Sequence, residues 1–72
     1  MDELIKKNNE LIELYNKNGD KKNYDIQKGI EKILKINDCF KYMQMDTALN
    51  ILLNLGYTKD EAKEKYKQLG AF

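Results

Sequence analysis

The sequence predicts an all-α fold, a small bundle of three to four short helices. The chain of 72 residues contains no proline, the residue that most strongly interrupts helices. Its apolar residues recur at spacings of three and four, which is the period of a helix with one buried face. A chain of this length supports one domain with a thin core. We therefore expect a single helical domain over residues 1–72, with N-terminal helices in 1–45 and a helix-turn-helix in 46–72.

The first helix is predicted from Asp2 to Lys17. Its apolar stripe comprises Leu4, Ile5, Leu11, Ile12 and Tyr15. Asn8 interrupts this stripe, and we expect its side chain to lie in water at the edge of the stripe. The alternative is that Asn8 fixes the register of a partner helix, because it occupies one position of a seven-residue spacing with Met1 and Tyr15.

A run of turn-forming residues predicts that the chain reverses after the first helix, with Gly19 ending that helix in the left-handed conformation. Oxygen-bearing side chains alternate along this run as in a calcium-binding loop: Asn16, Asn18 and Asp20. Lys21, however, stands where such a loop needs glycine, and Gln27 replaces its closing glutamate. We therefore expect no calcium site here.

A second helix is predicted over residues 25–36. Its apolar stripe comprises Ile26, Ile30, Ile33 and Leu34. The stripe would include Phe40 if the helix ran on, so the second and third helices could be continuous. Gly29 is a weak point in it, costing about 1 kcal/mol relative to alanine.

The stretch from residue 39 to residue 45 is rich in aromatic and sulfur-containing side chains: Cys39, Phe40, Tyr42, Met43 and Met45. One interpretation is that they fill the core at a junction between helices. The other is an exposed patch that docks a partner through Phe40, Tyr42 and Met43, because methionine adapts to irregular surfaces. Cys39 has no second cysteine with which to form an internal disulfide, and we expect a buried, unreactive thiol.

Capping signals divide the C-terminal third into two helices. Asp46 is the predicted N-cap of a helix at 47–55, which Gly56 would end. The residues expected to face inward from it are Leu49, Leu52 and Leu53. Thr58 and Glu61 form a capping box, in which each side chain accepts a hydrogen bond from the other residue's backbone, so a further helix begins directly afterwards. Its expected apolar and terminal residues are Ala62, Tyr66, Leu69 and Gly70.

The stretch from Ala48 to Ala62, Ala-Leu-Asn-Ile-Leu-Leu-Asn-Leu-Gly-Tyr-Thr-Lys-Asp-Glu-Ala, resembles the ubiquitin-associated (UBA) domain. It is more closely similar to the C-terminal domain of the RuvA family. In both families a leucine-rich helix ends in a glycine–aromatic turn before a capped helix, and both are small adaptor modules that dock other proteins. The contact residues that the resemblance implies are Leu55, Gly56, Tyr57 and the adjoining Leu69. The alternative is structural: Gly56 caps its helix, and Tyr57 packs over Ala62.

The composition lacks the residue types on which much catalysis depends. The chain contains no His, Ser or Arg, and its single Cys cannot form a thiolate cluster. Serine triads, cysteine–histidine dyads and zinc sites therefore lack essential parts. The 12 carboxylates are accompanied by no glycine-rich phosphate loop. We expect a non-enzymatic protein that holds no metal and no cofactor.

We therefore expect a protein-binding module that docks on a larger protein, as a small phage or mobile-element inhibitor or an accessory subunit does. The alternative is a helix-turn-helix DNA-binding regulator. Its second helix would carry the basic residues Lys59, Lys63, Lys65 and Lys67. Acidic residues on the same helix would repel phosphate, and the net charge of the chain is only +1. Those acidic residues are Asp60, Glu61 and Glu64.

Two further expectations concern assembly and location. Pairing of the first helix across a two-fold axis would give a homodimer and bury surface that a monomer leaves wet. No apolar run approaches the roughly 20 residues that a transmembrane helix needs, and the N-terminus lacks the pattern of a secretory signal. We expect a cytoplasmic protein with no membrane partner.

Overall fold

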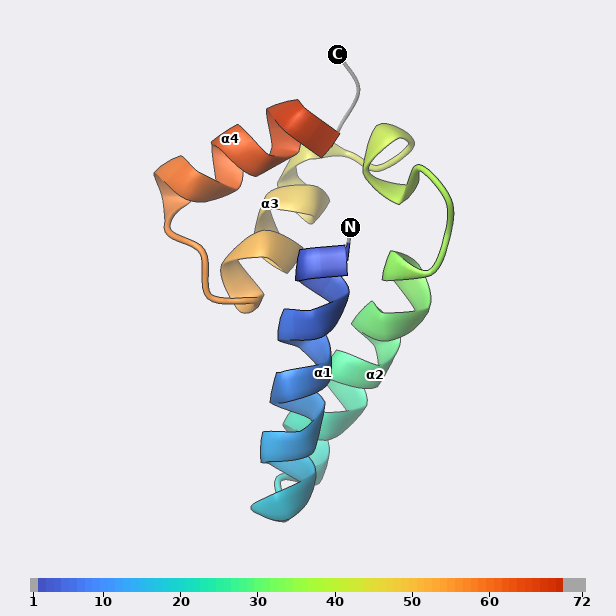
Figure 1. Ribbon diagram of the computed structural model, residues 1–72, viewed down its shortest axis with the longest axis vertical. Helices are drawn as coiled ribbons and strands as arrows, with labels where there is room; N and C mark the ends of the chain where they lie inside the picture. The colour runs from blue at the N-terminus through green and yellow to red at the C-terminus, as the bar shows by residue number, and fades with distance from the viewer. Residues whose placement is uncertain (1, 70–72) are drawn as a thin grey trace. The chain divides into compact units, whose positions relative to one another are not determined.

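The computed structural model describes residues 2–69, and within them every regular element is a helix (Figure 1). The elements are α1 (Asp2–Lys17), α2 (Lys21–Leu34), the short 3-10 helix η1 (Cys39–Lys41), α3 (Met45–Asn54) and α4 (Lys59–Leu69). The predicted all-α fold is confirmed. The predicted helix end at Gly70 lies outside the described residues.

The chain divides into two compact units, residues 1–36 and residues 37–72. The first unit holds α1 and α2, and the second holds η1, α3 and α4. The sequence grouped the aromatic and methionine-rich stretch 39–45 with the N-terminal helices. In the structure this stretch belongs to the second unit, where η1 contacts α4.

In the first unit, α1 and α2 pack side by side as an antiparallel hairpin (Figure 1). Gly19 ends α1 with a positive φ of 70°, as predicted. Its N–H donates to the Asn16 carbonyl over 3.2 Å, and the Asp20 N–H donates to the Tyr15 carbonyl over 2.9 Å. This pair of bonds is the Schellman motif, which satisfies carbonyls that the end of a helix leaves open.

Asp20 also starts the next helix. Its carboxylate accepts a hydrogen bond from the Asn23 backbone N–H at 3.3 Å and a second from the Asn23 side-chain amide at 2.7 Å. Because this N-cap satisfies the first turn, α2 begins at Lys21, earlier than the predicted start at Asp25. The turn between α1 and α2 is tight because Asp20 acts at both helix ends. Its N–H bonds to the end of α1, and its carboxylate caps the start of α2.

Two buried amide side chains lie at the contact between α1 and α2. Asn8 and Gln27 are each 1% exposed. The Gln27 side-chain amide donates to Asn8 Oδ1 over 2.7 Å, and the Asn8 amide donates to the Gln27 backbone carbonyl over 3.1 Å. The expectation that Asn8 is solvated is therefore wrong. Asn8 does pair with a partner helix, and that helix is α2 of the same chain.

The second and third predicted helices are separate. α2 ends at Leu34, and Asp38 adopts a left-handed conformation with φ 56° just before η1. A non-glycine residue in this region rarely continues a helix. Phe40 of η1 is 1% exposed, so this stretch anchors itself by burying an aromatic side chain.

α3 begins earlier than predicted and turns a different face inward. Its N-cap is Gln44, whose side chain makes no capping hydrogen bond, and Asp46 lies inside the first turn. There its charge still favours the positive end of the helix dipole. The buried residues on this helix and its C-cap are Ala48, Ile51, Leu52 and Leu55. Of the three leucines expected to face inward, only Leu52 is buried.

The turn between α3 and α4 follows the sequence prediction closely. Gly56 has φ 106°, and its N–H donates to the Leu53 carbonyl over 3.0 Å, while the Tyr57 N–H donates to the Leu52 carbonyl over 3.2 Å. Thr58 and Glu61 then form the predicted capping box. The Thr58 N–H donates to Glu61 Oε1 over 3.0 Å and the Glu61 N–H to Thr58 Oγ1 over 3.2 Å. These bonds fix where α3 ends and where α4 begins.

Candidate partner-binding groove

A groove runs between α3 and α4 on the second unit. Its α3 side carries a row of three apolar residues that stand one helical turn apart, Met45, Leu49 and Leu53, and the polar residues Asp46 and Asn50 also line this side. Met45 is 53% exposed and Leu53 is 38% exposed, while Leu49 is half-buried. These side chains reach the surface because the buried face of α3 passes through Ala48 and Leu52 instead.

The α4 side of the groove is basic. Its lysines again stand one turn apart: Lys59, Lys63 and Lys67. Among residues 2–69 none of these three ammonium groups takes part in an ion pair. Asp46 of α3 also lines the groove, so three positive charges stand against one negative charge.

The groove consists of two adjoining hollows that share Leu49 and Lys63. The hollow that includes Leu53 and Lys59 has a volume of about 430 Å³. The hollow that includes Met45 and Lys67 has a volume of about 330 Å³ and is also lined by the Tyr66 ring. We call the surface formed by Met45, Leu49, Leu53, Lys59, Lys63 and Lys67 the α3–α4 groove.

The acidic residues of α4 lie away from the α3–α4 groove. They line a separate hollow of about 300 Å³, together with Tyr57, Lys65 and Gln68. The acidic residues there are Asp60, Glu61 and Glu64. Lys65 Nζ lies 5.8 Å from the centroid of the Tyr57 ring, within the range of a cation–π contact. The three acidic side chains of α4 therefore lie outside the α3–α4 groove, in a hollow that they share with Lys65.

Two of the predicted partner-binding residues belong to the core. Phe40 is 1% exposed and Leu55 is 5% exposed, so neither offers surface to a partner. The expectation that they contribute exposed contacts is corrected. Both are large apolar side chains on segments that pack inside the second unit, where η1 and α3 each contact α4.

The other predicted residues remain at the surface in different degrees. Tyr42 is 79% exposed, and Met43 is half-buried beside it. Gly56 is exposed at the α3–α4 turn, whereas Tyr57 and Leu69 are half-buried. None of the five lines the α3–α4 groove.

The groove was not predicted from the sequence, although the sequence contains a signal for it. Met45, Leu49 and Leu53 repeat every four residues along α3, and Lys59, Lys63 and Lys67 do the same along α4. A four-residue spacing places side chains in one row along a helix. Leu49 and Leu53 were expected to face inward because leucine is usually buried. The lysines were considered only as the basic side of a DNA-binding helix, because acidic residues alternate with them.

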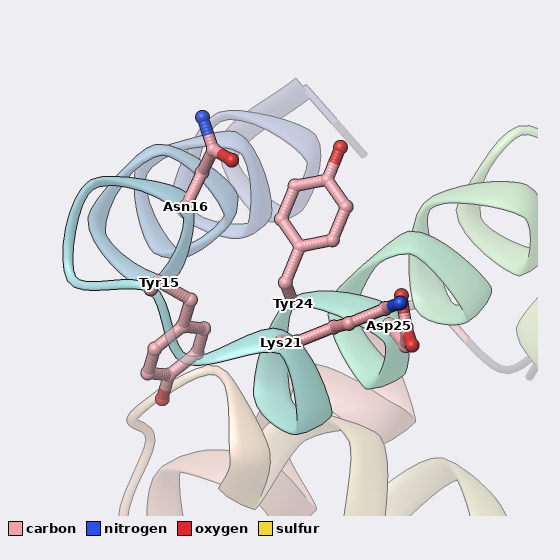
Figure 2. Close-up of a pocket in the computed structure, with 6 residues that line it drawn as sticks. Tyr15, Asn16, Lys21, Tyr24 and Asp25 are labelled. Atoms are coloured by element: carbon pink, nitrogen blue, oxygen red, sulfur yellow. The ribbon is translucent and has the colours of Figure 1, made fainter.

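A further hollow, of about 320 Å³, lies at the closed end of the α1–α2 hairpin. It is lined by Tyr15, Asn16, Gly19, Lys21, Tyr24 and Asp25. In Figure 2 the Tyr15 and Tyr24 rings point away from each other, and Lys21 and Asp25 extend from neighbouring turns of α2.

Two local environments shift the acidity of their groups. Burial raises the pKa of the Cys39 thiol, which is 6% exposed, and so favours its protonated form. On α2, Lys28 Nζ lies 3.0 Å from Glu31 Oε1. This hydrogen bond raises the pKa of Lys28 and lowers the pKa of Glu31. None of these three groups lines the α3–α4 groove.

Residues 2–69 hold no cluster of three or more His, Cys, Asp or Glu side chains arranged to bind a metal ion. None of the helices in this range has both the length and the apolar character needed to cross a bilayer.

No protein-family model, curated protein or solved structure matches the chain. The likeness of residues 48–62 to UBA and RuvA modules therefore remains a resemblance carried by those residues. The fold and the groove define the class: a small all-helical protein with an amphipathic surface groove between α3 and α4.

Proposed function

We propose that this chain is a non-enzymatic protein-binding module whose contact surface is the α3–α4 groove. The observation that carries the proposal is the apolar row Met45, Leu49 and Leu53 at the surface of a helix in a chain of 72 residues. Binding a partner would remove this apolar area from water, which contributes a favourable free energy of roughly 25 cal/mol per Å² buried. Apolar surface of this kind, with a polar border, is typical of sites that dock other proteins.

The roles that fit this proposal are those of a small inhibitor or an accessory subunit. Both need a rigid helical scaffold, a surface of limited area and no chemistry of their own. Phe40 and Leu55 supply core packing for the scaffold. The turn at Gly56 and the capping box at Thr58 hold α3 and α4 in the geometry that forms the groove.

Helix-turn-helix DNA binding is the second candidate, and the lysine row on α4 favours it. Lys59, Lys63 and Lys67 share one face, as phosphate-contacting lysines do. Asp60 and Glu61, however, lie in the first turn of α4, which is the part of a recognition helix that meets base edges. An apolar wall beside the lysines also suits a protein side chain better than a phosphate. We therefore favour a protein partner.

A pull-down with matched leucine variants tests the proposal. The tagged full chain, Leu53→Lys and Leu14→Lys are each incubated with lysate of the source organism, with and without nuclease. Leu53 and Leu14 are exposed leucines on helices, 38% and 49% exposed, but only Leu53 lies in the groove. We expect one protein to be retained by the wild type and by Leu14→Lys, and to be lost with Leu53→Lys.

Two results would contradict the proposal. Retention that disappears with nuclease would support the DNA-binding alternative. Equal retention by all three chains would place the contact surface outside the groove. Circular dichroism of each variant is the control for folding, since a surface leucine can be replaced by lysine without opening the core.

A further inference from the structure

The two walls of the α3–α4 groove differ in chemistry, and the difference specifies what would bind there. The α3 wall presents Met45, Leu49 and Leu53 in a row, and the row spans eight residues, or about 12 Å of helix. Helices that dock in grooves do so through apolar residues spaced three or four apart. Two to three turns of such a helix match the length of this wall.

The α4 wall sets the charge of the partner. Lys59, Lys63 and Lys67 run along it with the same four-residue spacing as the apolar row. Among residues 2–69 they form no ion pairs, and Asp46 is the acidic side chain that shares the groove with them. Lysine stems cover apolar surface while the ammonium groups stay in water, ready to meet carboxylates at the border of an interface.

We infer that the α3–α4 groove binds an amphipathic helix whose apolar stripe is flanked on one side by aspartate or glutamate. The inference rests on the proposed function and adds the chemistry of the partner to it. The apolar stripe of that helix would lie on Met45, Leu49 and Leu53. Its acidic flank would lie along the lysine row, so the charges fix the direction in which the helix docks.

Synthetic peptides test the inference directly. Fluorescent helical peptides carry leucines at i, i+4 and i+7 or at i, i+3 and i+7, and each is made with a glutamate flank and with a lysine flank. Binding to the full chain is measured by fluorescence anisotropy at physiological salt. We expect a glutamate-flanked peptide to bind about tenfold more tightly than its lysine-flanked counterpart. Each exposed ion pair contributes a fraction of a kcal/mol, and the pairs along the lysine row together account for about this factor.

Charge-swap variants separate charge recognition from loss of structure. Lys63→Glu/Lys67→Glu is expected to reverse the peptide preference, and Lys63→Gln/Lys67→Gln is expected to abolish the preference without reversing it. Leu53→Lys is expected to weaken both kinds of peptide. All three variants change exposed or groove-lining side chains. Circular dichroism of each variant is the control for retained helical structure.

The outcomes distinguish this inference from the proposed function. Equal binding of both flanks, or no binding of either peptide, overturns the acidic-helix inference, while the pull-down with Leu53→Lys still decides whether the groove binds a protein. Tighter binding to a DNA duplex or to anionic phosphatidylserine vesicles than to the acidic peptide would also overturn the inference. In that case the lysine row serves a polyanion instead.

Discussion

At the scale of single residues, Asn8 and Gln27 set the register between α1 and α2. A buried amide is costly unless its donors and acceptors are paired, and here each side chain supplies a partner to the other residue. Sliding one helix by a turn would break both bonds and leave two buried amides unsatisfied. The sequence revealed Asn8 as an interruption in an apolar stripe. It could not reveal Gln27, because the match depends on how two separate helices pack.

Replacing Asn8 with alanine should destabilise the protein by about 1–3 kcal/mol, because it leaves the Gln27 side-chain amide buried without its hydrogen-bond acceptor. The neighbouring Asn9 is exposed, so Asn9→Ala is the matched control and should change stability little. Urea unfolding followed by circular dichroism measures both. The double variant Asn8→Leu/Gln27→Leu should recover most of the loss. Equal effects of the two single alanine variants would contradict the register role.

Cys39 provides a pH test of burial. Burial raises the pKa of its thiol in the folded state, so the folded protein resists ionisation more than the unfolded chain does. Its contribution to stability is therefore complete below the unfolded thiol pKa of about 8.5 and is lost as the pH rises above that value. Unfolding measured between pH 7 and pH 10 should show a steeper loss for the wild type than for Cys39→Ala. Parallel pH curves for the two proteins would show that the thiol is not buried in solution.

At the scale of elements, the sequence predicted helix ends where side chains or glycines cap them locally. Thr58, Glu61 and Gly56 act on backbone groups within a few residues, so the α3–α4 turn was predicted correctly. The start of α2 was placed too late because Asp20 was counted only as a turn residue. The inward face of α3 was misassigned for a different reason. Leu49 and Leu53 are as apolar as Ile51 and Leu52, so hydrophobicity alone does not choose between two adjacent faces of one helix.

Two glycines should respond in opposite directions to the same substitution. Gly29 lies inside α2, and an added Cβ there meets no atom within 4 Å, so Gly29→Ala should stabilise the protein by about 0.5–1 kcal/mol. Gly56 has equally open space but a φ of 106°. Gly56→Ala should therefore cost about 1–2 kcal/mol through backbone strain alone. Thermal unfolding of the two variants measures the difference. A stabilising Gly56→Ala would mean that the turn adopts another conformation in solution.

At the scale of the whole molecule, net charge concealed the candidate site. The chain carries 13 lysines and 12 carboxylates, a nearly neutral balance that gave no reason to expect a charged surface. On α4 the structure places Lys59, Lys63 and Lys67 in the α3–α4 groove, and it places the acidic residues in another hollow beside Tyr57 and Lys65. Side chains four residues apart lie in one row on a helix, so charges that alternate along the sequence can lie on different sides of it. This sorting depends on the exact four-residue spacing, which composition does not record.

The groove and the glycine–aromatic turn are two competing positions for the contact surface, and one pair of variants separates them. Tyr57 is half-buried, and the Lys65 ammonium lies over its ring. Tyr57→Ala should therefore lower the melting temperature, while the partner is still retained in the pull-down. Leu53→Lys should do the reverse, abolishing retention of the partner while the melting temperature stays close to that of the wild type. Differential scanning fluorimetry and the pull-down together give both readouts. If Tyr57→Ala abolished retention with an unchanged melting temperature, the turn would be the contact surface that the UBA resemblance implies, and the groove would not.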